Sequence, residues 1–144
     1  MFFKIRKDAK WHNSSSLTVD DIVFTFNLIK DTNYQSTLRE SFNGVEIKKI
    51  DDDTIKFILS EPYAAFPELL TLGILPEDLW YKIPSASAGL AELNLKPVGS
   101  GPYKFQSFSK DKMGQIKSYS LIANENYYGP KAKVSNLNFK FFPN

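Results

Sequence analysis

Two short segments that alternate apolar and polar side chains flank three consecutive aspartates near the middle of this chain. Residues 45–50 and 54–59 have the two-residue period of a half-buried β-strand. The aspartates between them, residues 51–53, tolerate turn geometry, so the sequence predicts a β-hairpin. Further alternating segments, at residues 2–7 and beyond residue 102, follow short turns, which favours antiparallel pairing. The expected fold class is α+β, with a mostly antiparallel sheet and a few short helices.

A capped helix is predicted between the first strand and this hairpin. Thr18 is a favourable N-cap, and Asp21, three residues later, can complete a capping box. Apolar residues then recur at three- and four-residue steps as far as Lys30, which gives the helix one buried stripe formed by Val19, Ile22, Val23, Phe26 and Ile29. Shorter helical segments are predicted at residues 64–72 and 77–81.

Composition narrows the classes of function before any motif is considered. The length of 144 residues suffices for about one domain. The chain has no Cys, which excludes disulfides, thiol catalysis, zinc fingers and iron–sulfur clusters, and its single His excludes a site that needs two imidazoles. A formal net charge of +2 is too small to favour nucleic acid as a partner. Its 12 Phe and 7 Tyr favour β structure, and we expect several aromatic residues to form the core: Tyr103, Phe105, Tyr119, Phe139 and Phe141.

The residues that could carry chemistry form no recognisable catalytic motif. Ser14, Ser15 and Ser16 lie close to His12 in sequence, but there is no G-x-S-x-G motif, and a lone His is expected to be a packing or capping residue. The aspartates at 51–53 lack the alternating ligand positions of an EF-hand, and no glycine-rich phosphate-binding loop is present. The sequence therefore predicts no catalytic residue, no metal ligand and no cofactor.

Four segments of the chain carry motifs in a particular order. Residues 3–26 contain a strand, Trp11-His12, a polar turn and the capped helix T-V-D-D-I-V-F, and residues 53–63 read D-T-I-K-F-I-L-S-E-P-Y. They are followed by P-V-G-S-G-P-Y-K-F at residues 97–105 and N-E-N-Y-Y-G-P at residues 124–130. Together these segments resemble the dipeptide- and oligopeptide-binding proteins of ABC importers, a family that includes nickel-binding members. Two departures from the family pattern are the polar turn after His12, where Asp-Gly is usual, and Tyr128, where Trp is common.

This resemblance implies a place within a larger fold. Members of the family are several times longer, with two lobes that close on a ligand. By resemblance, the chain is an internal fragment and a partial lobe of a two-lobed periplasmic binding protein fold, with the export signal upstream. Residues 1–75 are expected to belong to the smaller lobe and residues 76–144 to the return into the main ligand-binding lobe, the two forming one compact unit in isolation.

The same resemblance implies a function for the parent protein. It would capture peptides for an ABC transporter permease, without enzymatic activity, as a periplasmic or extracellular membrane-associated protein. One lobe alone buries little of a peptide, so the isolated fragment is expected to bind ligand weakly or not at all. Tyr34, in the loop after the capped helix, is the single residue that the resemblance places near the ligand. The surface left by the missing lobe favours a homodimer of the fragment.

Two other interpretations stay open from the residues alone. A free-standing, aromatic-rich β interaction module would expose a contiguous apolar patch. A hydrolase would hold at least two titratable groups with shifted pKa values in a cleft.

Overall fold

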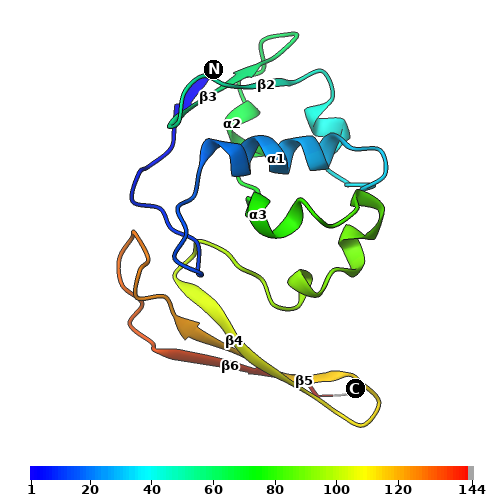
Figure 1. Cartoon of the computed structure of the whole chain (residues 1–144), viewed down its shortest axis with the longest axis vertical. Coiled ribbons are helices and arrows are strands. Elements are labelled where there is room, and N and C mark those ends of the chain that lie inside the picture. The colour runs from blue at the N-terminus through cyan, green and yellow to red at the C-terminus, as the bar shows by residue number, and fades with distance from the viewer. Residues whose placement is uncertain (143–144) are drawn as a thin grey trace.

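The computed structural model of the protein describes residues 1–142 and contains two three-stranded sheets. One sheet lies at the top and the other at the bottom of Figure 1, with helices and loops between them. All strand pairings within the two sheets are antiparallel, which confirms the predicted α+β class. The elements in chain order are β1 (Phe2–Lys4), α1 (Val19–Lys30), a 3₁₀ turn (Glu40–Phe42), β2 (Glu46–Lys49), β3 (Thr54–Ile58), α2 (Phe66–Leu69), α3 (Glu77–Trp80), 3₁₀ turns at Ser85–Leu90 and Glu92–Asn94, β4 (Tyr103–Lys110), β5 (Ile116–Ala123) and β6 (Asn136–Lys140).

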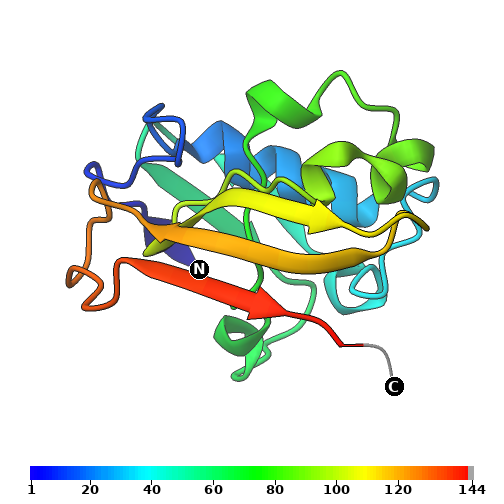
Figure 2. The same ribbon diagram turned by 90° about the horizontal axis from the view of Figure 1, so that it is seen from below.

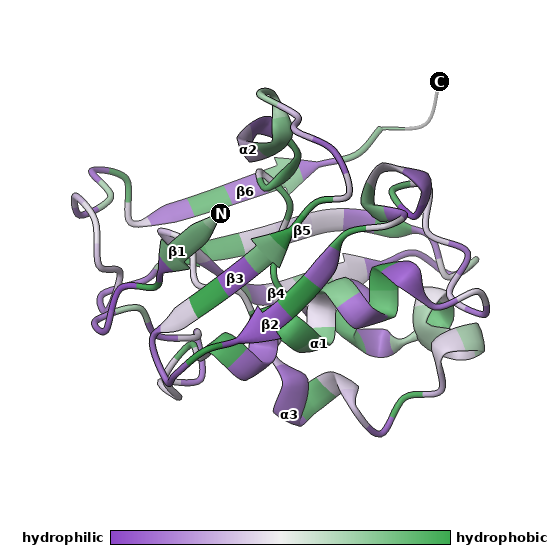
Figure 3. Ribbon diagram, turned by 90° about the horizontal axis from the view of Figure 1, so that it is seen from above, coloured by the Kyte–Doolittle hydropathy of each residue, from purple (hydrophilic) through white to green (hydrophobic). Residues whose placement is uncertain are grey.

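The first sheet has the order β1-β3-β2, with β3 at its centre. The predicted hairpin is confirmed: Ile47 pairs with Phe57 across β2 and β3. On the other side of β3, Phe3 of β1 pairs with Ile55, a long-range contact that the local pattern did not reveal. Seen from above in Figure 3, this sheet lies in front of α1, so that α1 covers one of its faces.

Helix α1 begins where its capping residues predict. The hydroxyl of Thr18 accepts a hydrogen bond from the backbone N–H of Asp21 at 3.4 Å, and the Asp21 carboxylate accepts one from the Thr18 N–H at 2.8 Å. This reciprocal capping box satisfies donors that an uncapped first turn leaves open. Lys30 lies in the last turn, where a positive charge favours the helix dipole.

The buried core belongs to the first sheet and α1. The ring of Phe26 lies edge-to-face against Phe42, with centroids 4.9 Å apart, and against Phe57 at 5.1 Å. Such aromatic pairs contribute about 1 kcal/mol each beyond the burial of their surface. The complete cluster of buried residues consists of Val19, Phe26, Ile29, Phe42, Val45, Ile55, Phe57 and Phe66.

The second sheet, with the order β4-β5-β6, has no comparable core. The prediction that its aromatic residues form the core was wrong: Phe139 is 50% exposed and Phe141 is 51% exposed. Tyr103, Phe105 and Tyr119 are half-buried, as is every residue of β5. The physical reason is that no helix in the described part of the chain packs extensively across this sheet, which lies open when viewed from below in Figure 2. Alternation therefore identified the strands, but not which of them would be covered.

Short helices and 3₁₀ turns connect the two sheets. The helix predicted at residues 64–72 is only the single turn α2, and the one predicted at residues 77–81 is α3. Helix α3 packs against α1, so the first part of this connection lies against the helix that covers the first sheet. Within residues 1–142, none of the helices combines the length and the apolar character needed to cross a bilayer.

Candidate functional site

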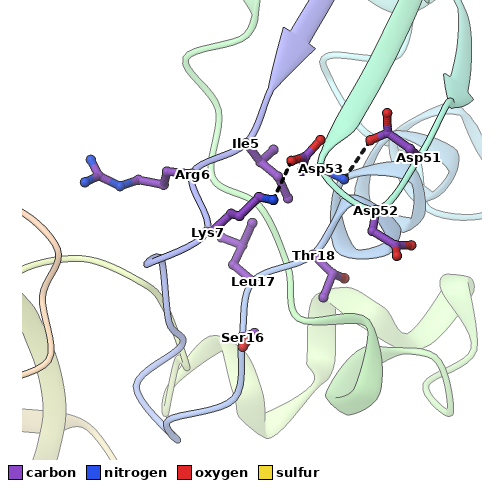
Figure 4. A pocket seen from close by; sticks show the side chains of 9 residues that line it. All are labelled: Ile5, Arg6, Lys7, Ser16, Leu17, Thr18, Asp51, Asp52 and Asp53. Carbon is purple, nitrogen blue, oxygen red and sulfur yellow. Dashed lines mark hydrogen bonds and ion pairs between the residues drawn. The ribbon is translucent and has the colours of Figure 1, made fainter.

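A groove of about 470 Å³ opens beside the first sheet. Three separate segments form its walls: the residues that follow β1, the residues that precede α1, and the β2–β3 turn. Ser16, Thr18, Asp51 and Asp52 are exposed, so the groove is open to solvent. Figure 4 shows its complete lining, which is Ile5, Arg6, Lys7, Ser16, Leu17, Thr18, Asp51, Asp52 and Asp53.

The charges of the groove are partly paired. Lys7 reaches toward Asp53, with 3.1 Å between its Nζ and the Asp53 Oδ2, whereas Arg6 points away from the groove (Figure 4). The hydrogen bond from Lys7 is the main cause of a lowered pKa at Asp53, and contacts with Asp51 and Thr54 lower this pKa further. Asp52 projects into solvent, with its Oδ1 3.5 Å from the Nζ of Lys49. Carboxylates in this arrangement can accept hydrogen bonds from an amine or a guanidinium group.

A second, polar hollow of about 240 Å³ lies at the start of α1 and is lined by Asp20, Asp21, Glu77 and Asp78 among other residues. The buried carboxylate of Asp21 is fully engaged. It accepts hydrogen bonds from the Trp11 indole at 3.2 Å and from the backbone N–H of Glu77 at 2.8 Å, in addition to the Thr18 contact. Burial raises the pKa of Glu77, and the nearby charges of Asp20, Asp21 and Asp78 raise it further. The hydrogen bonds of Asp21 in this hollow hold the loop after β1, α1 and α3 together.

The two sheets meet at a small set of loop contacts centred on His12. In Figure 1 the loop after β1 descends to the start of β4. There the Gly99 N–H donates to the Nδ1 of His12 at 3.0 Å, and the His12 N–H donates to the Gly99 carbonyl at 2.8 Å. The Nε2 of His12 lies 3.2 Å from the Gly101 carbonyl, which also accepts from the Asn124 amide at 3.0 Å. We call these four residues, His12, Gly99, Gly101 and Asn124, the joint.

One further contact supports the joint from the side. The guanidinium of Arg6 lies 4.1 Å from the centroid of the Tyr128 ring and is held there by a two-point ion pair with Asp8 at 2.7 and 2.9 Å. A cation over a partly exposed aromatic ring contributes about 0.5–1 kcal/mol. Arg6 thus connects the segment after β1 with the loop between β5 and β6.

Tyr34, the candidate ligand residue, lies apart from the groove. It is half-buried in the turn after α1, where its backbone N–H donates to the Asp31 carbonyl at 3.2 Å. The groove lies at the opposite end of α1, a helix of 12 residues and hence about 18 Å long. The structure therefore does not bring Tyr34 together with the groove residues.

The residues that sequence reasoning missed are those of the joint and the second role of Asp21. Asp21 was predicted as a capping residue only, and its bonds to Trp11 and Glu77 depend on tertiary packing. His12, Gly99 and Gly101 all lie in motifs noticed in the sequence, but their spacing carries no signal that they meet. The single His also lies outside the groove, so no imidazole can serve as a base for the groove's hydroxyl groups.

This capped α+β unit, linked by loops to a second antiparallel sheet, matches part of the solved structures of an oligopeptide-binding protein and of an ABC transporter substrate-binding protein. Residues 2–144 match the family described as "Bacterial extracellular solute-binding proteins, family 5 Middle", so the chain belongs to this family. The resemblance stated from the motifs is thereby confirmed.

Three relatives illustrate the match. The dipeptide-binding protein of Escherichia coli K12 is 31% identical over 98% of this chain. The oligopeptide-binding protein AppA of Bacillus subtilis, solved with a nonapeptide, has a TM-score of 0.85 at 26% identity over 98% of the chain. NikZ of Campylobacter jejuni, solved with Ni(L-His), also has a TM-score of 0.85, at 27% identity over 98% of the chain. The chain spans only 29%, 28% and 27% of these three proteins, respectively, which is consistent with a fragment.

Proposed function

We propose that the chain is part of an extracytoplasmic solute-binding protein that captures peptides and delivers them to an ABC transporter permease. The observation that carries this proposal is the family match over residues 2–144, together with relatives described as dipeptide- and oligopeptide-binding proteins. In this role the protein is a carrier and not an enzyme. The parent protein would work in the periplasm or outside the cell in association with the membrane.

Peptide binding in such a protein needs both lobes. A peptide held against one surface leaves most of its own surface in water and still loses its translational and rotational freedom. The groove beside the first sheet is open to solvent, so it would bury little of a peptide. Its lysine, Lys7, is already paired with Asp53 and is therefore not free to bind a peptide carboxylate. We therefore expect the isolated chain to bind peptides weakly or not at all, with tight binding restored only by closure of the complete protein.

Residues 1–75 would form the smaller lobe and residues 76–144 the return into the main ligand-binding lobe. In support, the first sheet and its core lie before residue 76, and the second sheet lies wholly after it. The lack of a core in the second sheet also fits a lobe whose remaining layers come from elsewhere in the parent protein. Limited proteolysis of the isolated chain tests this division: cleavage should spare residues 1–75 longest.

Calorimetry tests the binding proposal. The isolated chain and the full-length parent are titrated with the same dipeptide, tripeptide and pentapeptide mixtures. The parent should release or absorb heat with a saturating isotherm, and the isolated chain should not at micromolar peptide. Micromolar binding by the isolated chain would contradict the need for two lobes, and a parent that binds no peptide but binds Ni(L-His) would contradict the substrate class.

Tyr34 is the proposed ligand contact within this chain. Its ring is half-buried after α1 and presents a flat apolar face and one hydroxyl, which suit an extended peptide backbone. Tyr34→Ala in the full-length parent should weaken peptide binding several-fold. Tyr63→Ala, which removes a 50% exposed tyrosine after β3, is the matched control and should leave the affinity unchanged. Equal affinities of both variants would remove Tyr34 from the site.

A free-standing interaction module is the second candidate function, and one observation favours it. Phe139, Phe141 and Phe142 are exposed in and after β6, an edge strand among the described residues. The same rings favour a homodimer of the isolated chain. Sedimentation at increasing concentration separates the two candidates: a tight dimer would support the module, whereas a weak, concentration-dependent dimer is expected for a fragment.

A further inference from the structure

We propose that His12 is an acid-released latch: protonation of its ring opens the joint and lets the two sheets move relative to each other. The joint consists of His12, Gly99, Gly101 and Asn124. This inference goes beyond peptide capture, because it concerns how the two sheets of this chain are held together. It does not depend on the identity of the ligand.

The hydrogen bonds of His12 fit one neutral tautomer. Nδ1 accepts the Gly99 N–H at 3.0 Å, so Nδ1 must carry a lone pair. The Gly101 carbonyl, 3.2 Å from Nε2, can only accept, so Nε2 must carry the hydrogen. Protonation would place a second hydrogen on Nδ1, directed at the Gly99 N–H. Two donors would then face each other, and the hydrogen bond between the Gly99 N–H and the His12 ring would be lost.

The surroundings of the ring oppose protonation. Burial lowers the pKa of His12, and the positive charge of Lys104 on β4 lowers it further, while the bond to the Gly101 carbonyl acts in the opposite direction. Residues 99–102 contain no titratable side chain, and the titratable neighbours Lys10 and Glu125 are both exposed. No carboxylate is therefore positioned, among the described residues around the ring, to hold an imidazolium in place.

The close fit of Gly99 against the ring shows how tightly the joint is packed. A Cβ at residue 99 would lie 3.3 Å from the Cε1 of His12, whereas a Cβ at Gly101 would meet nothing within 4 Å. Outside the joint, neither the helices nor the strands β1, β2 and β3 pack extensively against β4, β5 or β6 in the described part of the chain. Protonation thus removes the bond from the Gly99 N–H to the ring, whereas the bond from the His12 N–H to the Gly99 carbonyl and the Arg6–Tyr128 contact remain. The latch requires that these remaining contacts do not by themselves fix the orientation of the two sheets.

The sign of the pH effect follows from this arrangement. In the open state His12 titrates near its ordinary value of about 6.5. In the closed state its pKa is lower, so the open state binds more protons. The latch is therefore complete above pH of about 6.5 and is lost as the pH falls below that value.

Nuclear magnetic resonance tests the latch directly, because the chain contains 1 His and its imidazole signal needs no assignment by mutation. We expect a titration midpoint below the ordinary value of about 6.5 and loss of Gly99 amide protection in the same step. A midpoint at or above that value, or a Gly99 amide that is unaffected while His12 titrates, would overturn the proposal.

Distance measurements test the movement. The chain has 0 Cys, so spin labels can be placed at two exposed residues, Lys48→Cys on β2 and Asn138→Cys on β6. Between pH 8 and pH 5 the distance distribution should broaden. The matched control is His12→Asn, whose side-chain oxygen can accept from Gly99 without titrating and should show no such broadening. An unchanged distribution in the native chain, or equal broadening in His12→Asn, would contradict the latch, and circular dichroism at pH 5 identifies any general unfolding.

Discussion

The indole N–H of Trp11 donates a hydrogen bond to the buried carboxylate of Asp21 at 3.2 Å, and thereby ties the loop after β1 to the first turn of α1. The same carboxylate receives the Thr18 and Glu77 backbone N–H groups, each at 2.8 Å. One side chain thus satisfies donors from the loop before α1, from the N-cap of α1 and from α3, which is 56 residues away in the chain. Because buried donors without a partner are costly, this carboxylate fixes the position of the loop that leads to His12 as well as the start of α1.

Replacement of Asp21 should be far more damaging than replacement of its neighbour. Asp21→Ala leaves the N–H groups of Trp11, Thr18 and Glu77 without their acceptor and should lower the free energy of unfolding by about 3 kcal/mol. Asp20→Ala removes an exposed partner of Lys49 and should change it by less than about 1 kcal/mol. Urea unfolding followed by Trp fluorescence measures both. Similar losses in the two variants would show that Asp21 is not the centre of this network.

The two sheets should respond very differently to loss of an aromatic ring. Phe26→Ala opens a cavity in the buried cluster and should cost about 4 kcal/mol. Phe139→Ala removes a ring that is 50% exposed and should cost less than about 1 kcal/mol in the isolated chain. Denaturant unfolding of the two variants makes the comparison. A large loss on removal of Phe139 would mean that the second sheet has a covering layer in solution.

Residue 99 should tolerate no side chain without adjustment of the joint. Gly99→Ala brings a methyl group to 3.3 Å from the His12 ring, which should destabilise the joint by about 1 kcal/mol. Gly101→Ala points its methyl group into open space and serves as the control. The readouts are the melting temperature and the His12 titration midpoint, which should move toward its ordinary value in Gly99→Ala only. Identical behaviour of the two variants would count against a packed joint.

Glu77 should make the fold slightly less stable at neutral pH. Burial and the charges of Asp20, Asp21 and Asp78 raise its pKa above the ordinary value, so the folded chain binds more protons at this group than the unfolded chain. Its unfavourable contribution to stability therefore appears as the pH rises from the ordinary pKa of the group through its raised pKa in the folded chain, and it is complete at pH 7. Glu77→Gln should raise stability at pH 7 by less than about 1 kcal/mol and have no such effect at pH 3.

Melting temperatures at these two pH values test the Glu77 prediction. Glu125→Gln, which neutralises an exposed carboxylate outside the hollow, is the control for a general effect of net charge. Equal gains in both variants at pH 7 would assign the effect to net charge and not to the cluster around Asp21.

Local patterns predicted the elements of the first unit well. The Thr18–Asp21 capping box and the β2–β3 hairpin were expected and are present. Each of these features depends on residues that are close together in the chain, so it can be predicted from the sequence. The addition of β1 to β3 and the shortness of α2 were not expected, since pairing partners and helix length depend on packing against distant segments.

The candidate site was less accessible to sequence reasoning. Tyr34 came from a resemblance, and the structure places it at the far end of α1 from the groove. Lys7 and Asp53 lie 3.1 Å apart in the groove although they belong to separate segments. No period or motif links such pairs, because a contact between loops leaves no repeating pattern in either of them.

The amino-acid sequence by itself determined the capped helix, the alternating strands, the absence of thiol chemistry and the motifs that the family shares. Only the tertiary structure decided that Phe26 is buried while Phe139 is exposed, and that His12 binds Gly99, 87 residues away. The reason is the range of the forces involved. Capping and strand alternation act between residues a few positions apart, whereas burial and the joint depend on which surfaces meet once the whole chain has folded.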